Sequence, residues 1–252
     1  MAQTSYSISF GPRFDRRTAP VTYWYLVAAL VIWVLGFLAP GAGLGEALAF
    51  RADSWTQRPW TLVVYPLHWV GMHPLNVLML GYVLWWSAGD NEMWWGPRVQ
   101  AGFFVAMAAG MALALALGGA AFGEGATASG PGALISGSLT IWCLRHLEAQ
   151  ILLLFVPVTG RLLLGLEILV LWWSYGPALG VCAVLGCPGL AVAYFYWGHH
   201  LHQIPRRLGL DAGSRQARQV RRQKTERDRR VREIFERSGL HVVDDDEKGS
   251  RG

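Results

Sequence analysis

The stretch HWVGMHPLNVLML (68–80) places two histidines and an asparagine in a run that is otherwise apolar enough for a protein core or a membrane. Burying a polar side chain is costly unless a hydrogen-bonding partner replaces its lost hydration. His68, His73 and Asn76 therefore each need a partner, and the sequence around them decides which environment they meet.

The composition indicates a membrane protein with several spanning segments. Of the 252 residues, 53% are hydrophobic and only 15% are charged, whereas a soluble domain carries about 25% charged residues. Much of the charge follows Pro205. We expect an all-α membrane domain at 21–206, after an N-terminal segment (1–20) and before a basic helical tail (207–252) with a disordered end.

Apolar windows close to the roughly 20 residues that a helix needs to cross a bilayer recur along the chain. They lie at 21–39, 69–88, 101–122, 131–145, 160–175 and 187–203, which predicts six spans. The fourth and fifth windows are short, so we expect neighbouring helices to shield them from lipid. The apolar segment 150–157 is too short to cross and is expected to lie along the cytoplasmic face.

Basic residues orient these spans. Arg13, Arg16 and Arg17 precede the first span, and Arg206 and Arg207 follow the sixth. Because cytoplasmic loops are enriched in Lys and Arg, both termini are expected in the cytoplasm, in agreement with an even number of spans. Anionic lipid is the expected partner of Arg206 and Arg207.

Several polar and aromatic residues outside the opening stretch carry further expectations. Loop 40–60 contains Phe50, Trp55 and Trp60, which are expected to anchor it in the outer interface. Glu92 is expected to anchor the cytoplasmic end of the second span by bonding loop amides. For Glu167 two alternatives remain open, a pair with Arg161 or an internal polar contact.

The sequence predicts no metal and no cofactor. His199, His200 and His202 lie close together, but zinc sites need three or four protein ligands and no cysteine or carboxylate cluster is near them. Cys182 and Cys187 are expected to flank a loop, and they pair only if that loop faces an oxidising compartment. Nucleic acid is not an expected partner, because acidic residues dilute the charge of the tail.

Residues 60–96 (WTLVVYPLHWVGMHPLNVLMLGYVLWWSAGDNEMWWG) resemble the start of the rhomboid intramembrane serine protease fold. The matching positions are Trp60, His68, His73, Asn76, Glu92 and Gly96. The resemblance continues through all six windows and implies a six-helix rhomboid-like bundle. The tail segment VREIFERSGL (231–240) is similar to a helix that ends bacterial members, which implies the bacterial inner membrane.

The resemblance also implies roles for the opening trio. His68 would shape the interior near the outer mouth, and His73 and Asn76 would line the oxyanion side of the site. Asn76 follows His73 by three residues instead of the usual four, which turns its side chain by about 100°. The alternative is that the trio bonds to loop carbonyls and water and holds the second span in place.

Rhomboid chemistry requires a serine at the start of span four, and a histidine on span six to accept its proton. An alignment by length down to Arg145 puts Gly132 at the serine position, and an alignment by the glycine interval puts Ser129 there. Ser129 is equally explained as the N-cap of span four. Both alternatives remain open.

Span six lacks the expected histidine. Gly189 and Ala193 match the small-residue pair of the family, and this places Gly186 where the histidine should be. His199, the nearest histidine, lies about 15 Å further along a helix, whereas proton transfer requires contact at about 3 Å or one bridging water.

The sequence therefore predicts a rhomboid-like pseudoprotease that binds transmembrane segments of client proteins between spans two and five, with loop 40–60 as a second contact. One alternative is an active intramembrane serine protease with Ser129 as nucleophile and His68 or His73 as base. Another is a structural subunit of a larger membrane complex, docked by its tail. The expected partners are membrane proteins, and no small-molecule substrate is expected.

Overall fold

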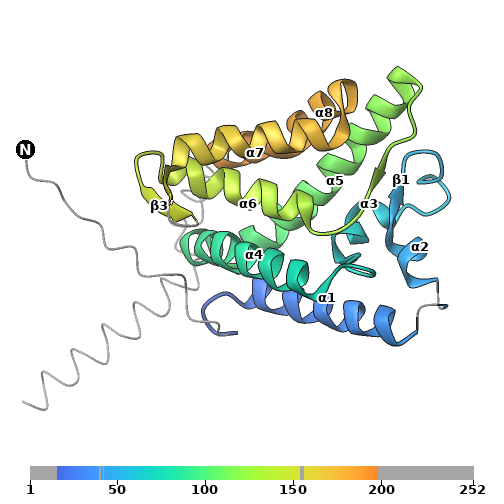
Figure 1. Ribbon diagram of the computed structural model, residues 1–252, viewed down its shortest axis with the longest axis horizontal. Coiled ribbons are helices and arrows are strands. Elements are labelled where there is room, and N and C mark those ends of the chain that lie inside the picture. Colours follow the sequence, from blue (N-terminus) through green and yellow to red (C-terminus); the bar gives the residue numbers. More distant parts are fainter. Residues whose placement is uncertain (1–15, 40, 42, 154–155, 198–252) are drawn as a thin grey trace, which may run out of the picture. The chain divides into compact units, whose positions relative to one another are not determined.

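The computed structural model describes residues 16–39, 41, 43–153 and 156–197 (Figure 1). These residues form a mostly helical unit. The expected helical tail, the histidines at 199, 200 and 202, and the lipid-facing arginines at 206 and 207 lie outside the described residues.

Long helices account for most of the unit. They are α1 (Pro20–Leu38), α4 (Pro74–Trp95), α5 (Pro97–Phe122), α6 (Gly132–Arg145), α7 (Gly160–Tyr175) and α8 (Pro177–Val184), which continues through the π-helical turn η2 (Leu185–Gly189) to Trp197. Between α1 and α4 lie α2 (Leu44–Leu48), α3 (Thr61–Val64) and the 3₁₀ turn η1 (Tyr65–Leu67). The strands β1 (Phe50–Arg51) and β2 (Thr127–Ala128) pair antiparallel, as do β3 (Gln150–Leu153) and β4 (Val156–Thr159).

Three helices of the described part are long and apolar enough to cross a membrane, which indicates a membrane protein. They are α1, α5 and the continuous helix Pro177–Trp197. Helix α4 has 22 residues but carries polar groups in its last two turns, and α6 and α7 have 14 and 16 residues. The helices α1, α4, α6 and α7 lie side by side in this order (Figure 1).

The core is built around α5, which contacts α1, α3, α4, α6 and α8. Its side chains Phe103, Met107, Met111 and Leu115 are almost completely buried. Phe50, expected as an interfacial anchor, is fully buried beside Tyr65. The expectation for Phe50 is wrong because the β1–β2 pairing carries its side chain into the core. Trp60 is about half exposed.

Two spans begin at residues other than those expected. Helix α4 starts at Pro74 instead of 69, because the chain turns at Gly71 with φ 79° before His73 forms the N-cap. The helix expected at 187–203 starts at Pro177, directly after Gly176 ends α7 with φ 77°. Proline in the first helical turn loses no hydrogen bond, so both starts follow the usual N-terminal preference.

One loop expectation is wrong, and the structure gives the fold of a second expected loop segment. Cys182 and Cys187 flank no loop, because both lie in the continuous helix Pro177–Trp197, and both are free thiols. Segment 150–157 forms most of the β3–β4 hairpin. The hairpin satisfies backbone groups that a single short apolar segment would leave unpaired.

Glu92 connects α4 to the start of α1. Its carboxylate accepts hydrogen bonds from the Val21 and Thr22 amides at 2.8 and 2.9 Å and from the Thr22 hydroxyl at 2.8 Å. The first amides of a helix have no partner within that helix, and the positive end of its dipole favours a negative charge. The amides that Glu92 binds therefore belong to the first turn of a neighbouring helix, not to a loop as the sequence indicated.

We expect Glu92→Gln to lower the free energy of unfolding in detergent micelles by about 2–4 kcal/mol, because glutamine has one acceptor oxygen instead of two and no charge. The control Glu148→Gln changes an exposed side chain that pairs with Arg161, and exposed pairs contribute little to stability. Denaturant titration of both variants measures the difference. Equal stability of the two variants would contradict the capping role of Glu92.

Candidate functional site

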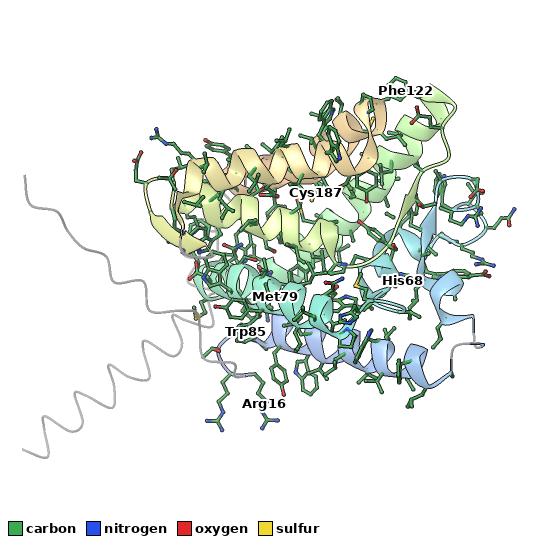
Figure 2. The ribbon with its side chains drawn as sticks, in the orientation of Figure 1. Arg16, His68, Met79, Trp85, Phe122 and Cys187 are labelled. Carbon is green, nitrogen blue, oxygen red and sulfur yellow. The ribbon has the colours of Figure 1, made fainter. Side chains whose placement is uncertain are left out.

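The structure does not bring the opening trio together in one site. His73 caps α4, with its Nδ1 accepting a hydrogen bond from the Leu75 amide at 3.3 Å, and both His73 and Asn76 are exposed. His68, labelled in Figure 2, is half-buried beside Gly45 of α2. His73 thus caps the helix that it precedes. Asn76 is exposed and makes no hydrogen bond to a buried polar group of the described residues.

His68 is the member of the trio with unusual surroundings. Burial lowers the pKa of its ring below the ordinary range, so the imidazole is neutral at pH 7. Its Nδ1 is buried and makes no hydrogen bond to any described residue. No hydrogen bond joins Ser129 to either ring nitrogen of His68 in the described part of the chain, so the pair that an active serine would need is not formed there.

The candidate serine positions lie at the start of α6. Ser129 is exposed and is not the N-cap, because the cap position belongs to Pro131 and carries no side-chain hydrogen bond. The capping interpretation of Ser129 is therefore wrong by two residues. Gly132, the other candidate, is the first residue of the helix and is exposed.

Gly186, the expected histidine position, faces α5. A Cβ atom built on Gly186 would lie 2.9 Å from the Gly110 carbonyl oxygen and in contact with Ala114. Side-chain carbon atoms cannot approach a backbone oxygen this closely without displacing the helix. No histidine fits at position 186 in this arrangement, because its side chain would run into α5.

The small-residue pair Gly189 and Ala193 does not form the close contact between the helix Pro177–Trp197 and α5. Ala193 is exposed, and a Cβ atom on Gly189 would meet only atoms of residues 184 and 185. The tight contacts with α5 involve Gly186 instead, and Cys182 against Gly118. Small residues at these positions allow two backbones to approach closely.

A polar cluster links α6 and α7 inside the helical unit. The Glu167 Oε1 atom lies 2.5 Å from the Ser136 hydroxyl and 3.2 Å from the Thr140 hydroxyl, and Oε2 lies 3.4 Å from Thr140. We call Ser136, Thr140 and Glu167 the hydroxyl clasp. Ser136 and Thr140 are buried and stand one turn apart on the same face of α6, so a single carboxylate reaches both.

Cys187, labelled in Figure 2, belongs to η2 and lies next to Ser136 of the hydroxyl clasp. Its thiol donates to the Ala133 carbonyl oxygen at 3.0 Å and lies within hydrogen-bonding reach of Ser136. The side chain that the last helix directs toward Ser136 is thus a completely buried thiol and not an imidazole.

A second polar network connects α4 to α6. The Arg145 guanidinium donates to the Asp90 carboxylate at 2.8 Å and to the side-chain oxygen Oδ1 of Asn91 at 3.3 Å. The side-chain nitrogen Nδ2 of Asn91 in turn donates to the Ser138 backbone oxygen at 2.8 Å. The guanidinium also stacks 4.6 Å from the centre of the Trp94 ring. This network fixes the position of α4 against α6.

Glu167 does not pair with Arg161, which binds the exposed Glu148 instead. Of the two alternatives for Glu167, the structure forms the internal polar contact. Spacing along one helix does not reveal this, because the hydroxyl partners lie on another helix. The available signal was the i, i+4 spacing of Ser136 and Thr140 in an apolar run, which places two hydroxyls on one helix face.

The described residues contain no group of three or more histidine, cysteine or acidic side chains that could hold a metal ion. The remaining described histidine, His146, contacts the Trp142 carbonyl oxygen of its own segment. The site is therefore a set of hydroxyl, thiol and carboxylate groups that join helices. Searches against protein-family models and against curated proteins find no match to this chain.

We expect the double change Ser136→Ala and Thr140→Val to reduce the free energy of unfolding by about 1–3 kcal/mol, because it leaves the Glu167 carboxylate without donors. The matched control Ser87→Ala removes a buried hydroxyl whose bond stays inside α4, to the Val83 oxygen. Thermal unfolding in micelles compares them. A double variant that unfolds at the temperature of the control would show that the hydroxyl clasp does not stabilise the protein.

Proposed function

We propose that this chain is a catalytically inactive rhomboid-like membrane protein that binds transmembrane segments of other proteins. The resemblance of residues 60–96 supports the family, and the six longest helical segments of the described part overlap the six expected windows. On this proposal α1, α4, α5, α6, α7 and the helix that begins with α8 are the six spans, and both termini are cytoplasmic.

The observation that carries the inactive assignment is the packing of Gly186 against α5. A rhomboid protease needs an imidazole on its last helix to accept the serine proton, since a free hydroxyl is a poor nucleophile. The position that the sequence alignment assigns to this histidine, Gly186, packs against α5, and the side chain of the same turn that contacts α6 is the Cys187 thiol. The described histidines bond to backbone atoms or, at the His68 Nδ1, to no described atom.

Exposed side chains of α4 and α7 support the binding of transmembrane segments. On α4 they include Leu75, Leu78, Met79 and Tyr82, and on α7 they include Leu162, Leu166, Leu169, Val170 and Trp173. Only Gly160 and Leu163 of α7 are buried. Helix α6 lies between α4 and α7 and is itself largely buried. Lipid or a partner helix can therefore cover the exposed apolar side chains of α4 and α7.

We expect a photo-crosslinking residue at Leu78 or Leu169 to capture the same membrane proteins, with the crosslink mapped by mass spectrometry to a transmembrane segment of the partner. The control position Phe37, on α1, is at least as exposed as Leu78 and Leu169 but lies on neither α4 nor α7. The experiment uses the full chain in its native membrane. Identical capture from all three positions, or capture of lipid alone, would refute client binding at this face.

We expect a serine-reactive fluorophosphonate probe to leave the purified full-length protein unlabelled, because its candidate nucleophile Ser129 has no bonded base. An active rhomboid protease labelled in parallel verifies the probe. Labelling that disappears in Ser129→Ala but persists in Ser136→Ala would establish the alternative, an active intramembrane serine protease.

A further inference from the structure

Glu167 differs from the other two carboxylates that join helices in this unit. Asp90 is neutralised by Arg145, and Glu92 accepts two amides at the positive end of α1. Glu167 receives bonds from two neutral hydroxyls only. It is therefore the carboxyl group whose charged form is stabilised neither by a described cation nor by a helix N-terminus.

The basic residues nearest to it in the sequence are already engaged. Arg161 pairs with Glu148 and Arg145 with Asp90, and no described cation lies within ion-pair distance of Glu167. A carboxyl group in an apolar environment takes up a proton unless a partner stabilises its charge, and ionisable groups in spanning helices are generally paired or functional. A cation from outside the described part of the chain would supply Glu167 with the partner that the described residues do not provide.

The position of Glu167 on α7 makes it reachable by a neighbouring helix. It is partly exposed, at the boundary between the seam with α6 and the outward face that carries Leu166 and Val170. A carboxylate offers about four acceptor sites, and Oε2 makes only the longer 3.4 Å contact to Thr140. A long basic side chain on a helix packed beside α7 can therefore bind Oε2 while the hydroxyl bonds to Oε1 remain.

We propose that the transmembrane segments bound by this chain carry a lysine or arginine within their apolar run, and that this residue pairs with Glu167. The inference rests on the proposed function and names the chemical class of the client. A basic residue is unfavourable in the interior of a lone spanning helix. A cation beside Glu167 favours its ionised form and is neutralised by it, so a client segment with a buried cation gains more from binding here than a purely apolar one.

The test uses the full-length protein in phosphatidylcholine vesicles and synthetic polyleucine spanning peptides with a central lysine, leucine or glutamine. Energy transfer between a donor on the protein and an acceptor on the peptide measures binding. We expect the lysine peptide to bind at least tenfold more tightly than the other two, which corresponds to about 1.4 kcal/mol. Glu167→Gln, which keeps an acceptor for Ser136, should abolish this preference, and the control Glu148→Gln should retain it.

The outcomes separate this inference from the proposed function. If all peptides bind wild type equally, client binding stands and the requirement for a cation is refuted. If the lysine preference persists in Glu167→Gln, another group binds the cation and the inference is again refuted. If no peptide binds, both proposals fail. The three peptides are compared on the wild-type protein, so this comparison tests the inference even if the Glu167→Gln variant misfolds.

A second copy of this chain is the competing occupant of the α7 face. Energy transfer between differently labelled copies, measured without peptide, detects it. Self-association that the lysine peptide fails to displace and that Glu167→Gln abolishes would assign Glu167 to an interface between copies and overturn the client inference.

Discussion

The close approach of α5 and η2 at Gly110 and Gly186 determines the chemistry of the interior. Each glycine lies so near the backbone of the other that a side chain at either position would displace the helix. This contact turns position 186 toward α5 and the neighbouring Cys187 toward α6. Ser136 consequently meets a thiol and a carboxyl group from the adjoining helices, and none of the described histidines hydrogen-bonds to it.

Polar groups elsewhere hold the helices in register. Glu92 joins α4 to the first turn of α1, Arg145 joins α6 to α4, and the hydroxyl clasp joins α7 to α6. Hydrophobic attraction between helices is weak in lipid, because lipid tails are as apolar as the side chains that they replace. Directional bonds of this kind are accordingly well suited to specify which helix neighbours which.

The sequence predicted the helices with sharp apolar boundaries closely and missed those whose boundaries depend on backbone geometry. The windows 21–39 and 160–175 agree within one residue with α1 and α7. The last helix was placed ten residues too late, because a segment with glycine, cysteine and proline is typical of a loop, whereas here a π-helical turn accommodates Pro188. The hydroxyl clasp was not predicted, since partners on different helices meet only through tertiary packing.

The π-helical turn at Leu185–Gly189 also affects how this helix can be compared with others. Successive residues of an α-helix are rotated by about 100°, and a π turn contains one residue more than an α turn. Any residue-by-residue comparison with an uninterrupted helix therefore changes face across the turn. Gly186 and Cys187 lie within it, so their equivalents in a regular helix are defined by the direction of the side chain and not by counting along the chain.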